Sequence, residues 1–349
     1  MANIVDVAKK SGVAISTVSN IINGTRYVSP ETTEKVLRII EELGYETDPI
    51  ARRMKSSRSN MIGVIITNFS RVFFAPVLRH CREIAEAQGF TLMCIESNDD
   101  FELEKQHVNT LRQNRFDAII LDTVAEPDNY AYYEELRNLS CRGKQIAVTC
   151  LERDCSPFGL DSVEPDNYNG AILAVEHLLH MGCENILHIT GPINSLSAEK
   201  RARGYGDAIH RRENRKPQIA MGDFSPQSGY DAVKKALVQN REIPFDAIFA
   251  SNDQMAVGAL QALKEFNIRV PQDVRVVGFD DSFVASLVDP SLTSIHISRS
   301  GVGIEAMHRV LDRMENFTAP AQCSAVKASL VVRKSTDPNV FISPGFADW

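Results

Sequence analysis

Two polar side chains stand directly after apolar runs that read as β-strands. Asn252 follows the run 246–251, and Asp280 follows the run 274–279. Open α/β sheets bind ligands outside the carboxyl ends of their strands, so both side chains are candidate ligand-binding groups. A carboxylate accepts hydrogen bonds from two hydroxyls, and an amide both donates and accepts. This combination suits a polyhydroxylated ligand such as a sugar.

Two aromatic residues occupy similar positions. Phe73 follows the first strand-like run, and Phe224 follows the strand-like segment Ile219–Asp223. Either ring can pack on the apolar face of a sugar or on a purine ring. Packing inside the core explains both residues equally well, so the sequence leaves the two interpretations open.

From residue 61 onward, strand-like and helix-like segments alternate. The strand-like runs are nearly all apolar, as in parallel strands buried on both faces, and they span 61–67, 90–96, 117–121, 145–151, 185–190, 246–251 and 274–279. Helical patterns such as Asn167–Met181 and Asp253–Phe266 lie between them. The pattern predicts an α/β core, 61–338, of two doubly wound parallel-sheet lobes. We expect lobe 1 at about 61–160 and 293–320, lobe 2 at about 161–292 and 321–338, and a loosely ordered tail at 339–349.

Residues 1–46 predict an all-α unit of three short helices. Asn3 with Asp6 suits the start of the first helix, and Ser29-Pro30 suits the start of the third. Gly12 permits a tight turn before a second helix from about Ile15 to Ile22, as in a helix-turn-helix. Any small three-helix bundle is the alternative interpretation. Residues 47–60 predict a linker that forms a helix only conditionally, because it has few apolar residues.

The N-terminal end of the 349-residue chain differs in charge from the remainder. The formal net charge is −7, but residues 1–60 hold nine Lys/Arg and seven Asp/Glu, and residues 49–60 hold four cations and no acid. Because a basic segment adjoins an otherwise acidic chain, we expect any nucleic-acid contact to lie at the N-terminal end.

No apolar run reaches the length of a membrane span, and no signal peptide is present, so we expect a cytoplasmic protein. The seven cysteines lack a C-x-x-C pair and predict reduced thiols. We expect neither a metal nor a cofactor.

The segment from Ile4 to Gly24 contains the pattern D-V-A-K-K-S-G-V-A-I-S-T-V-S-N-I-I-N and closely resembles the headpiece of the lac repressor family. The resemblance continues through Ala51-Arg52-Arg53-Met54, Ile62–Ile66, the motif Ala250–Gly258 and the motif Val276–Asp281. These ordered motifs across residues 4–281 identify the chain as a member of that family. Two departures stand out, because the family usually has Ser where this chain has Ala14 and Leu where it has Met54.

The resemblance implies a transcription regulator, most simply a repressor. It implies a homodimer on near-palindromic double-stranded operator DNA, controlled allosterically by a small effector that we expect to be a sugar or sugar phosphate. The residues that match DNA-contacting positions of the family are Ile15, Ser16, Thr17, Ser19, Asn20, Asn23, Tyr27, Arg52, Met54 and Lys55. Those that match its effector cleft are Phe73, Glu152, Arg201, Phe224, Asn252 and Asp280. At the position of Glu152 many members have Asp, so its reach into the cleft is an open question.

Three alternatives remain at this stage. A purine is the second candidate effector. A sugar-binding transport component shares the two-lobed fold, but the headpiece and the lack of a signal peptide argue against it. A sugar-processing enzyme is disfavoured because G-x-S-x-G, P-loop and G-x-G-x-x-G motifs are missing, so we expect no enzymatic activity.

Overall fold

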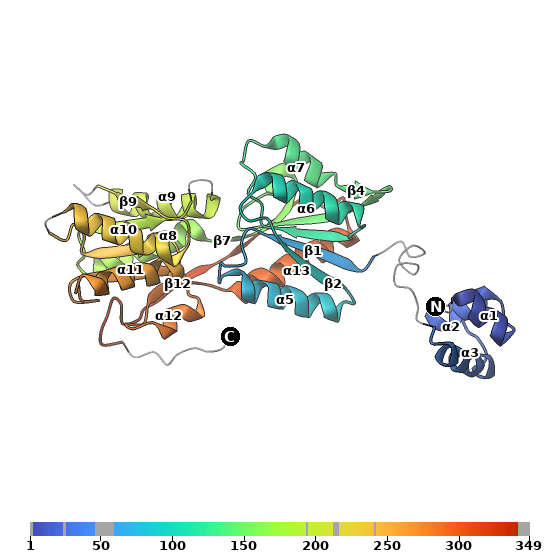
Figure 1. Cartoon of the computed structure of the whole chain (residues 1–349). Helices are drawn as coiled ribbons and strands as arrows, with labels where there is room; N and C mark the ends of the chain where they lie inside the picture. Colours follow the sequence, from blue (N-terminus) through green and yellow to red (C-terminus); the bar gives the residue numbers. More distant parts are fainter. Residues whose placement is uncertain are drawn as a thin grey trace. The chain divides into compact units, whose positions relative to one another are not determined.

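The computed structural model describes residues 3–23, 26–45, 59–192, 195–211, 216–240 and 242–340. Contacts divide the chain into an N-terminal unit, residues 1–59, and a larger core, residues 60–349 (Figure 1). The N-terminal unit contains α1 (Ile4–Ser11), α2 (Ile15–Asn23) and α3 (Pro30–Leu43). It is the helical helix-turn-helix region that the sequence predicts.

The ends of these helices follow from their sequence. Asn3 and Asp6 form a reciprocal capping box at the start of α1, and Ser29 with Pro30 starts α3. Gly12 ends α1 at φ 71°, where its N–H donates to the Ala8 carbonyl oxygen. A residue with a Cβ is disfavoured in this left-handed conformation, so the glycine fixes the turn. The small core is built around residues from all three helices, which are Val7, Ala8, Val18, Val36 and Ile39.

Lobe 1 of the core is a six-stranded, all-parallel sheet. Its strands are β1 (Met61–Ile66), β2 (Thr91–Glu96), β3 (Ala118–Leu121), β6 (Ala147–Leu151), β7 (Asp161–Pro165) and β13 (Cys323–Val326). Their order across the sheet is β13-β7-β6-β3-β1-β2. The helices α5 (Phe74–Ala87) and α13 (Arg299–Glu315) pack together on one face, and α6 (Phe101–Gln113) packs on the other. Smaller elements are α7 (Tyr130–Arg137), the hairpin β4 (Ser140–Cys141) with β5 (Lys144–Gln145), and a 3₁₀ turn, Ser156–Phe158.

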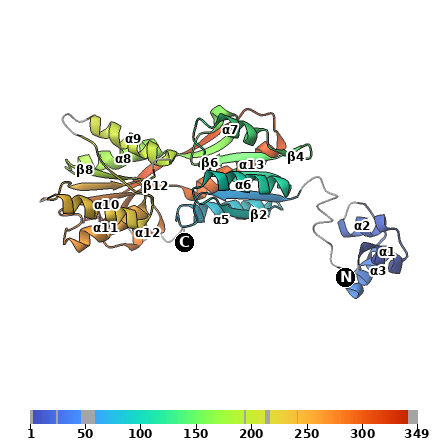
Figure 2. The ribbon, with the colours of Figure 1, turned by 45° about the horizontal axis from the view of Figure 1, so that its top comes forward.

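Lobe 2 repeats this architecture. Its strands are β8 (Ile186–Thr190), β9 (Gln218–Met221), β10 (Ala247–Ala250), β11 (Arg275–Asp280), β12 (Thr293–Ile297) and β14 (Ala328–Val331). The order is β14-β12-β11-β10-β8-β9, and only β14 runs antiparallel to its neighbour. The pair α8 (Asn167–His180) and α9 (Leu196–His210) covers one face, and α10 (Pro226–Gln239) with α11 (Asp253–Glu265) covers the other (Figure 2). The short α12 (Phe283–Leu287) follows β11.

The chain passes between the lobes at three places, and this corrects the expected lobe boundaries. Residues 161–165 and 323–326 belong to the lobe 1 sheet, whereas 293–297 belong to the lobe 2 sheet. The passages therefore follow β7, β12 and β13. Each of these strands pairs within one sheet before the next element packs in the other lobe, so strand pairing sets the boundary. The linker expected at 47–60 lies almost entirely outside the described residues, as does most of the tail.

Both sheets place a topological switch at the same relative position. In lobe 1 the strand order reverses between β1 and β3, and in lobe 2 between β8 and β10. Loops leave the carboxyl ends of such neighbouring strands in opposite directions and open a crevice there. The residues that the sequence proposes for an effector line a cleft in this region. Among the described residues, no helix is long and apolar enough to cross a membrane.

Candidate functional site

A cleft of about 710 Å³, including its open mouth, lies at the carboxyl ends of the strands of both lobes. Its lining includes all six residues that the sequence proposes for an effector, namely Phe73, Glu152, Arg201, Phe224, Asn252 and Asp280. The fold thus brings together side chains that lie up to 207 positions apart in the chain. That they bind an effector remains a prediction.

Arg201 on α9 is held rigidly by the protein itself. Its side chain is 3% exposed, and its guanidinium carbon lies 3.8 Å from the centroid of the Phe279 ring. Nε donates to Asn167 Oδ1 at 2.8 Å, Nη2 donates to Asp280 Oδ1 at 3.3 Å, and Nη1 donates to the Ser251 carbonyl oxygen. Three of the five N–H groups of the guanidinium thus donate to protein oxygens. Arg201 lines the cleft in a position that these contacts fix.

Asn252 has a structural task that the sequence interpretation did not foresee. Its Oδ1 accepts from the Met255 N–H at 2.8 Å and so caps α11. Its Nδ2 donates to the Phe224 carbonyl oxygen at 3.0 Å. Phe224 has a positive φ of 71°, and this bond fixes the turn that aims its ring. Asn252 therefore shapes the cleft wall as well as lining it.

Two buried carboxyl groups lie close together at the end of β11. Burial raises the pKa of Asp280, and the positive charge of Arg201 opposes that rise. Asp253 accepts from the Ser282 N–H at 2.6 Å and from Ser294 Oγ at 2.6 Å. Its pKa is raised to about 7, mainly by burial and then by the charge of Asp280. The lobe 2 wall is thus acidic but extensively hydrogen-bonded.

Glu152 contrasts with these residues because one of its oxygens has no partner. It follows β6 with a φ of 64°, and its Oε1 is buried without a hydrogen bond among the described residues. Burial, followed by the charge of Asp122, raises the pKa of Glu152 to about 8. A buried, unpaired polar atom is costly, and a ligand that supplies a hydrogen bond removes that cost. Glu152 therefore reaches the cleft, which answers the question left open by its departure from Asp.

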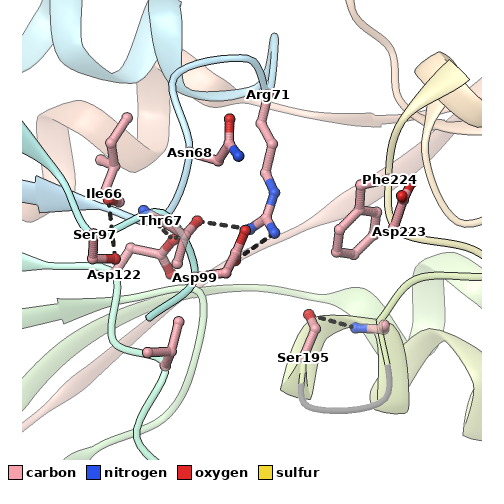
Figure 3. A network of polar contacts seen from close by, with 12 residues as sticks. Ile66, Thr67, Asn68, Arg71, Ser97, Asp99, Asp122, Ser195, Asp223 and Phe224 are labelled. Carbon is pink, nitrogen blue, oxygen red and sulfur yellow. Dashed lines mark hydrogen bonds and ion pairs between the residues drawn. The ribbon is translucent and has the colours of Figure 1, made fainter. Parts of the chain in front are cut away.

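Several residues of lobe 1 that line the cleft were not proposed from the sequence, among them Thr67, Arg71 and Asp122. Thr67 donates through Oγ1 to Asp122 Oδ2 at 2.6 Å, and Arg71 donates to Thr67 Oγ1 at 2.6 Å (Figure 3). Burial raises the pKa of Asp122, whereas its bonds to Thr67 lower it. Thr67 and Asp122 directly follow β1 and β3, so the strand-end argument applied to Asn252 identifies them too. Arg71 lies in a loop and carries no comparable signal.

The aromatic residues line the cleft and are also packed. Phe73 is 8% exposed and meets Phe74 edge to face, with ring centroids 5.4 Å apart. Phe224 is 6% exposed, and a Cβ built on Gly191 would lie 2.3 Å from its Cζ. Only a glycine fits beside this ring. Both phenylalanines are therefore packed within the protein and also line the cleft, and their contact with a ligand remains a prediction.

The headpiece presents some of its proposed DNA-contacting residues more openly than others. Ile15 is 43% exposed, Tyr27 is 90% exposed, and Ser16 is exposed. Thr17, Ser19 and Asn20 are half-buried. The side chain of Asn23 and the residues Arg52, Met54 and Lys55 lie outside what the structure describes. Their contacts with DNA remain predictions.

Clusters of metal-ligand residues are not found in the part of the chain that the structure describes. All seven cysteines are free thiols. The described residues thus offer a polar cleft with aromatic surfaces.

A helix-turn-helix unit joined to a two-lobed, binding-protein-like core with a polar cleft defines a ligand-responsive DNA-binding transcription regulator. Residues 3–48 match the family model of bacterial regulatory proteins, lacI family, and residues 175–336 match that of the periplasmic binding protein-like domain. The chain is 31% identical over 339 residues to the HTH-type transcriptional repressor PurR of Histophilus somni, covering 96% of this chain and 99% of that one. Identity to PurR of Haemophilus influenzae strain Rd is 32%, over 96% and 98% of the two chains. The protein belongs to the lacI family of bacterial regulatory proteins.

Solved structures agree with this assignment. The lac repressor dimer bound to operator and the anti-inducer ONPF superposes with a TM-score of 0.85 at 27% identity, over 96% of this chain and 99% of that one. The complex of the transcriptional regulator CelR with cellobiose gives a TM-score of 0.69 at 26% identity, over 96% and 100% of the chains.

Proposed function

We propose that this regulator is a repressor that binds a near-palindromic operator as a homodimer and changes its operator affinity when a small neutral sugar occupies the cleft. Its PurR relatives are repressors by name, and the lac repressor neighbour is a dimer on operator DNA. A repressor works where the chromosome is, so we propose a cytoplasmic location. A ligand that favours one lobe arrangement shifts the population, and the headpieces then bind DNA differently.

The observation that carries the sugar assignment is the unpaired Oε1 of Glu152. It lies among the cleft-lining carboxyl groups of Asp122 and Asp280, and both raise its pKa. Ligand hydroxyls are donors that satisfy such acceptors, while Arg201 donates to ligand oxygens. A CelR neighbour is described as a cellobiose complex, which is a precedent for a sugar in this fold.

The same carboxyl groups distinguish neutral sugars from sugar phosphates. A phosphate adds negative charge near Glu152, whose ionisation the charges of Asp122 and Asp280 already oppose. We therefore favour a neutral sugar over the phosphorylated alternative. A purine is the second candidate, because Phe73 and Phe224 both line the cleft and because relatives carry the name PurR.

We do not assign catalysis to the cleft. The relatives are transcriptional repressors by name, and the headpiece makes DNA binding the output of the protein. The same headpiece argues against a role as a transport component. In this proposal the cleft acts by binding alone.

A thermal-shift screen tests the effector class directly. Neutral sugars such as D-ribose and cellobiose, sugar phosphates, purines and amino acids are added singly to the full chain. We expect a neutral sugar to raise the melting temperature and Asp280→Ala to lose that response, because the variant removes an acceptor from the cleft. Stabilisation by a purine alone, lost in Phe224→Ala, would replace the sugar with a purine and leave the regulator assignment standing.

A DNA-binding assay tests the output. Duplexes selected from a random pool by the full chain should not bind a variant that lacks residues 1–59. Asn20→Ala should relax base preference at one position in each half-site by roughly 1–3 kcal/mol if the amide contacts a base in bidentate fashion. Unchanged preference at every position would remove Asn20 from the residues that read sequence.

A further inference from the structure

Arg71 connects the two walls of the cleft. Its side chain is anchored in lobe 1, where Nη1 donates to Thr67 Oγ1 and Nη2 donates to Asp99 Oδ1, each at 2.6 Å. From there the guanidinium lies over the ring of Phe224 in lobe 2, with 4.9 Å between its carbon and the ring centroid (Figure 3). A planar cation over an aromatic face is a favourable contact. Arg71 is thus a bridge between the lobes.

A second contact joins the same loop to lobe 2. The Val72 N–H donates to Gln254 Oε1 at 3.1 Å, and Gln254 Nε2 donates to the Ser70 carbonyl oxygen at 3.1 Å. Gln254 lies in the first turn of α11, directly after the Asn252 cap. One side chain therefore binds the backbone on both sides of Arg71. Residues 70 and 72 thus form hydrogen bonds with Gln254, and Arg71 between them contacts Phe224, so all three residues of the loop contact lobe 2.

These contacts affect the surface on which a ligand would stack. The tip of the Phe224 ring is packed against Gly191, and Asn252 fixes the Phe224 backbone, so the ring cannot easily turn away. The guanidinium of Arg71 covers the ring face at which it lies. A sugar or a heteroaromatic ring that stacks on that face needs the space that Arg71 occupies.

We propose that Arg71 is a built-in competitor of the effector: in the ligand-free protein it occupies the face of Phe224 and, with Gln254, holds the lobes together, and an effector binds by displacing it. The proposal rests on the proposed function, because it places the effector in this cleft. It differs from the simpler role of a cationic ligand contact. The two roles predict opposite effects when the cation is removed.

The first experiment measures affinity by calorimetry with cellobiose and D-ribose as probes. Arg71→Met removes the cation and keeps much of the side-chain length, and it should tighten binding of the responding sugar on the order of fivefold, the factor expected of one lost cation–π contact. The matched control is Arg82→Met, at an exposed arginine of α5 that forms an ion pair with Glu86 one turn further along the same helix. Weaker or unchanged binding by Arg71→Met would overturn the proposal.

The second experiment needs no ligand. Hydrogen exchange resolved to single amides follows the Val72 N–H, whose acceptor lies across the cleft. Exchange should accelerate severalfold in Arg71→Met and in Gln254→Ala but not in Arg82→Met. Unchanged exchange in Arg71→Met would show that Arg71 does not hold the lobes together. If neither sugar binds the wild type while Val72 responds as expected, the sugar assignment fails and the interlobe contact stands.

Discussion

The two walls of the cleft differ in how fully the protein satisfies their polar groups. In lobe 2, the side chains of Arg201 and Asn252 form hydrogen bonds with other groups of the protein. In lobe 1, Glu152 keeps an oxygen without a partner, and Arg71 reaches across to Phe224. The lobe 2 wall is therefore preorganised, whereas the lobe 1 wall has interactions that a ligand can gain or replace. We infer that effector binding changes lobe 1 contacts more than lobe 2 contacts.

The largest expected loss of stability comes from replacing Arg201, which holds the preorganised lobe 2 wall together. Arg201→Ala should lower the free energy of unfolding by about 3–5 kcal/mol, because it leaves Asp280 buried without its cationic partner. Urea denaturation measures this loss. Arg203→Ala, at an exposed arginine two residues along the same helix, is the control and should change stability little. An equal loss of unfolding free energy in the two variants would contradict the conclusion that Arg201 holds the lobe 2 wall in place.

A smaller effect separates the two tasks of Asn252. Asn252→Ala removes both the helix cap and the bond to the Phe224 carbonyl oxygen and should cost about 1–3 kcal/mol. Asn252→Asp keeps an oxygen for the cap but cannot donate to Phe224. We therefore expect an intermediate loss for Asp, measured in the same urea titration. A loss for Asp as large as that for Ala would place the main effect at Phe224.

The third effect concerns Glu152 in the lobe 1 wall and depends on pH. The pKa of Glu152 is raised from 4.5 to about 8 in the folded protein, so between these values the folded state binds the extra proton. Stability contributed by this group is present below about pH 4.5 and is lost as pH rises toward 8. Glu152→Gln mimics the protonated form and does not titrate. Melting temperatures of the two proteins should agree at pH 5, and the variant should become the more stable one by pH 8. A constant difference across this range would mean that Glu152 does not titrate there.

The sequence predicted the lobe 2 wall better than the lobe 1 wall for a physical reason. Asn252 and Asp280 lie at the ends of regular elements, and Arg201 lies in a local motif on α9, so neighbouring residues already indicate their position. Arg71 depends on contacts with Asp99 and Phe224, which are distant in the chain, so no local pattern reveals it.

The prediction of the fold from the sequence was limited in the same way. Strands such as β1, β3 and β11 and helices such as α8 and α11 were predicted close to their observed bounds. The strands β7, β12 and β13 were not among the predicted runs, and the division of the chain between the lobes was not predicted either, because no local feature specifies the sheet in which a strand pairs. Pairing partners such as β7 with β13 are separated by more than 150 residues. Hydrophobic periodicity indicates that a strand forms, but long-range pairing decides where it lies.

The most direct test of the account measures operator affinity by fluorescence anisotropy, with and without the sugar found in the screen. The proteins are the wild type, Asp280→Ala, and the control Asp231→Ala at an exposed position of α10. We predict that the sugar shifts the operator affinity of the wild type and the control by on the order of tenfold, within the usual range of allosteric coupling. Asp280→Ala should bind the operator normally and show no shift. An equal shift in Asp280→Ala would contradict control of DNA binding through this cleft.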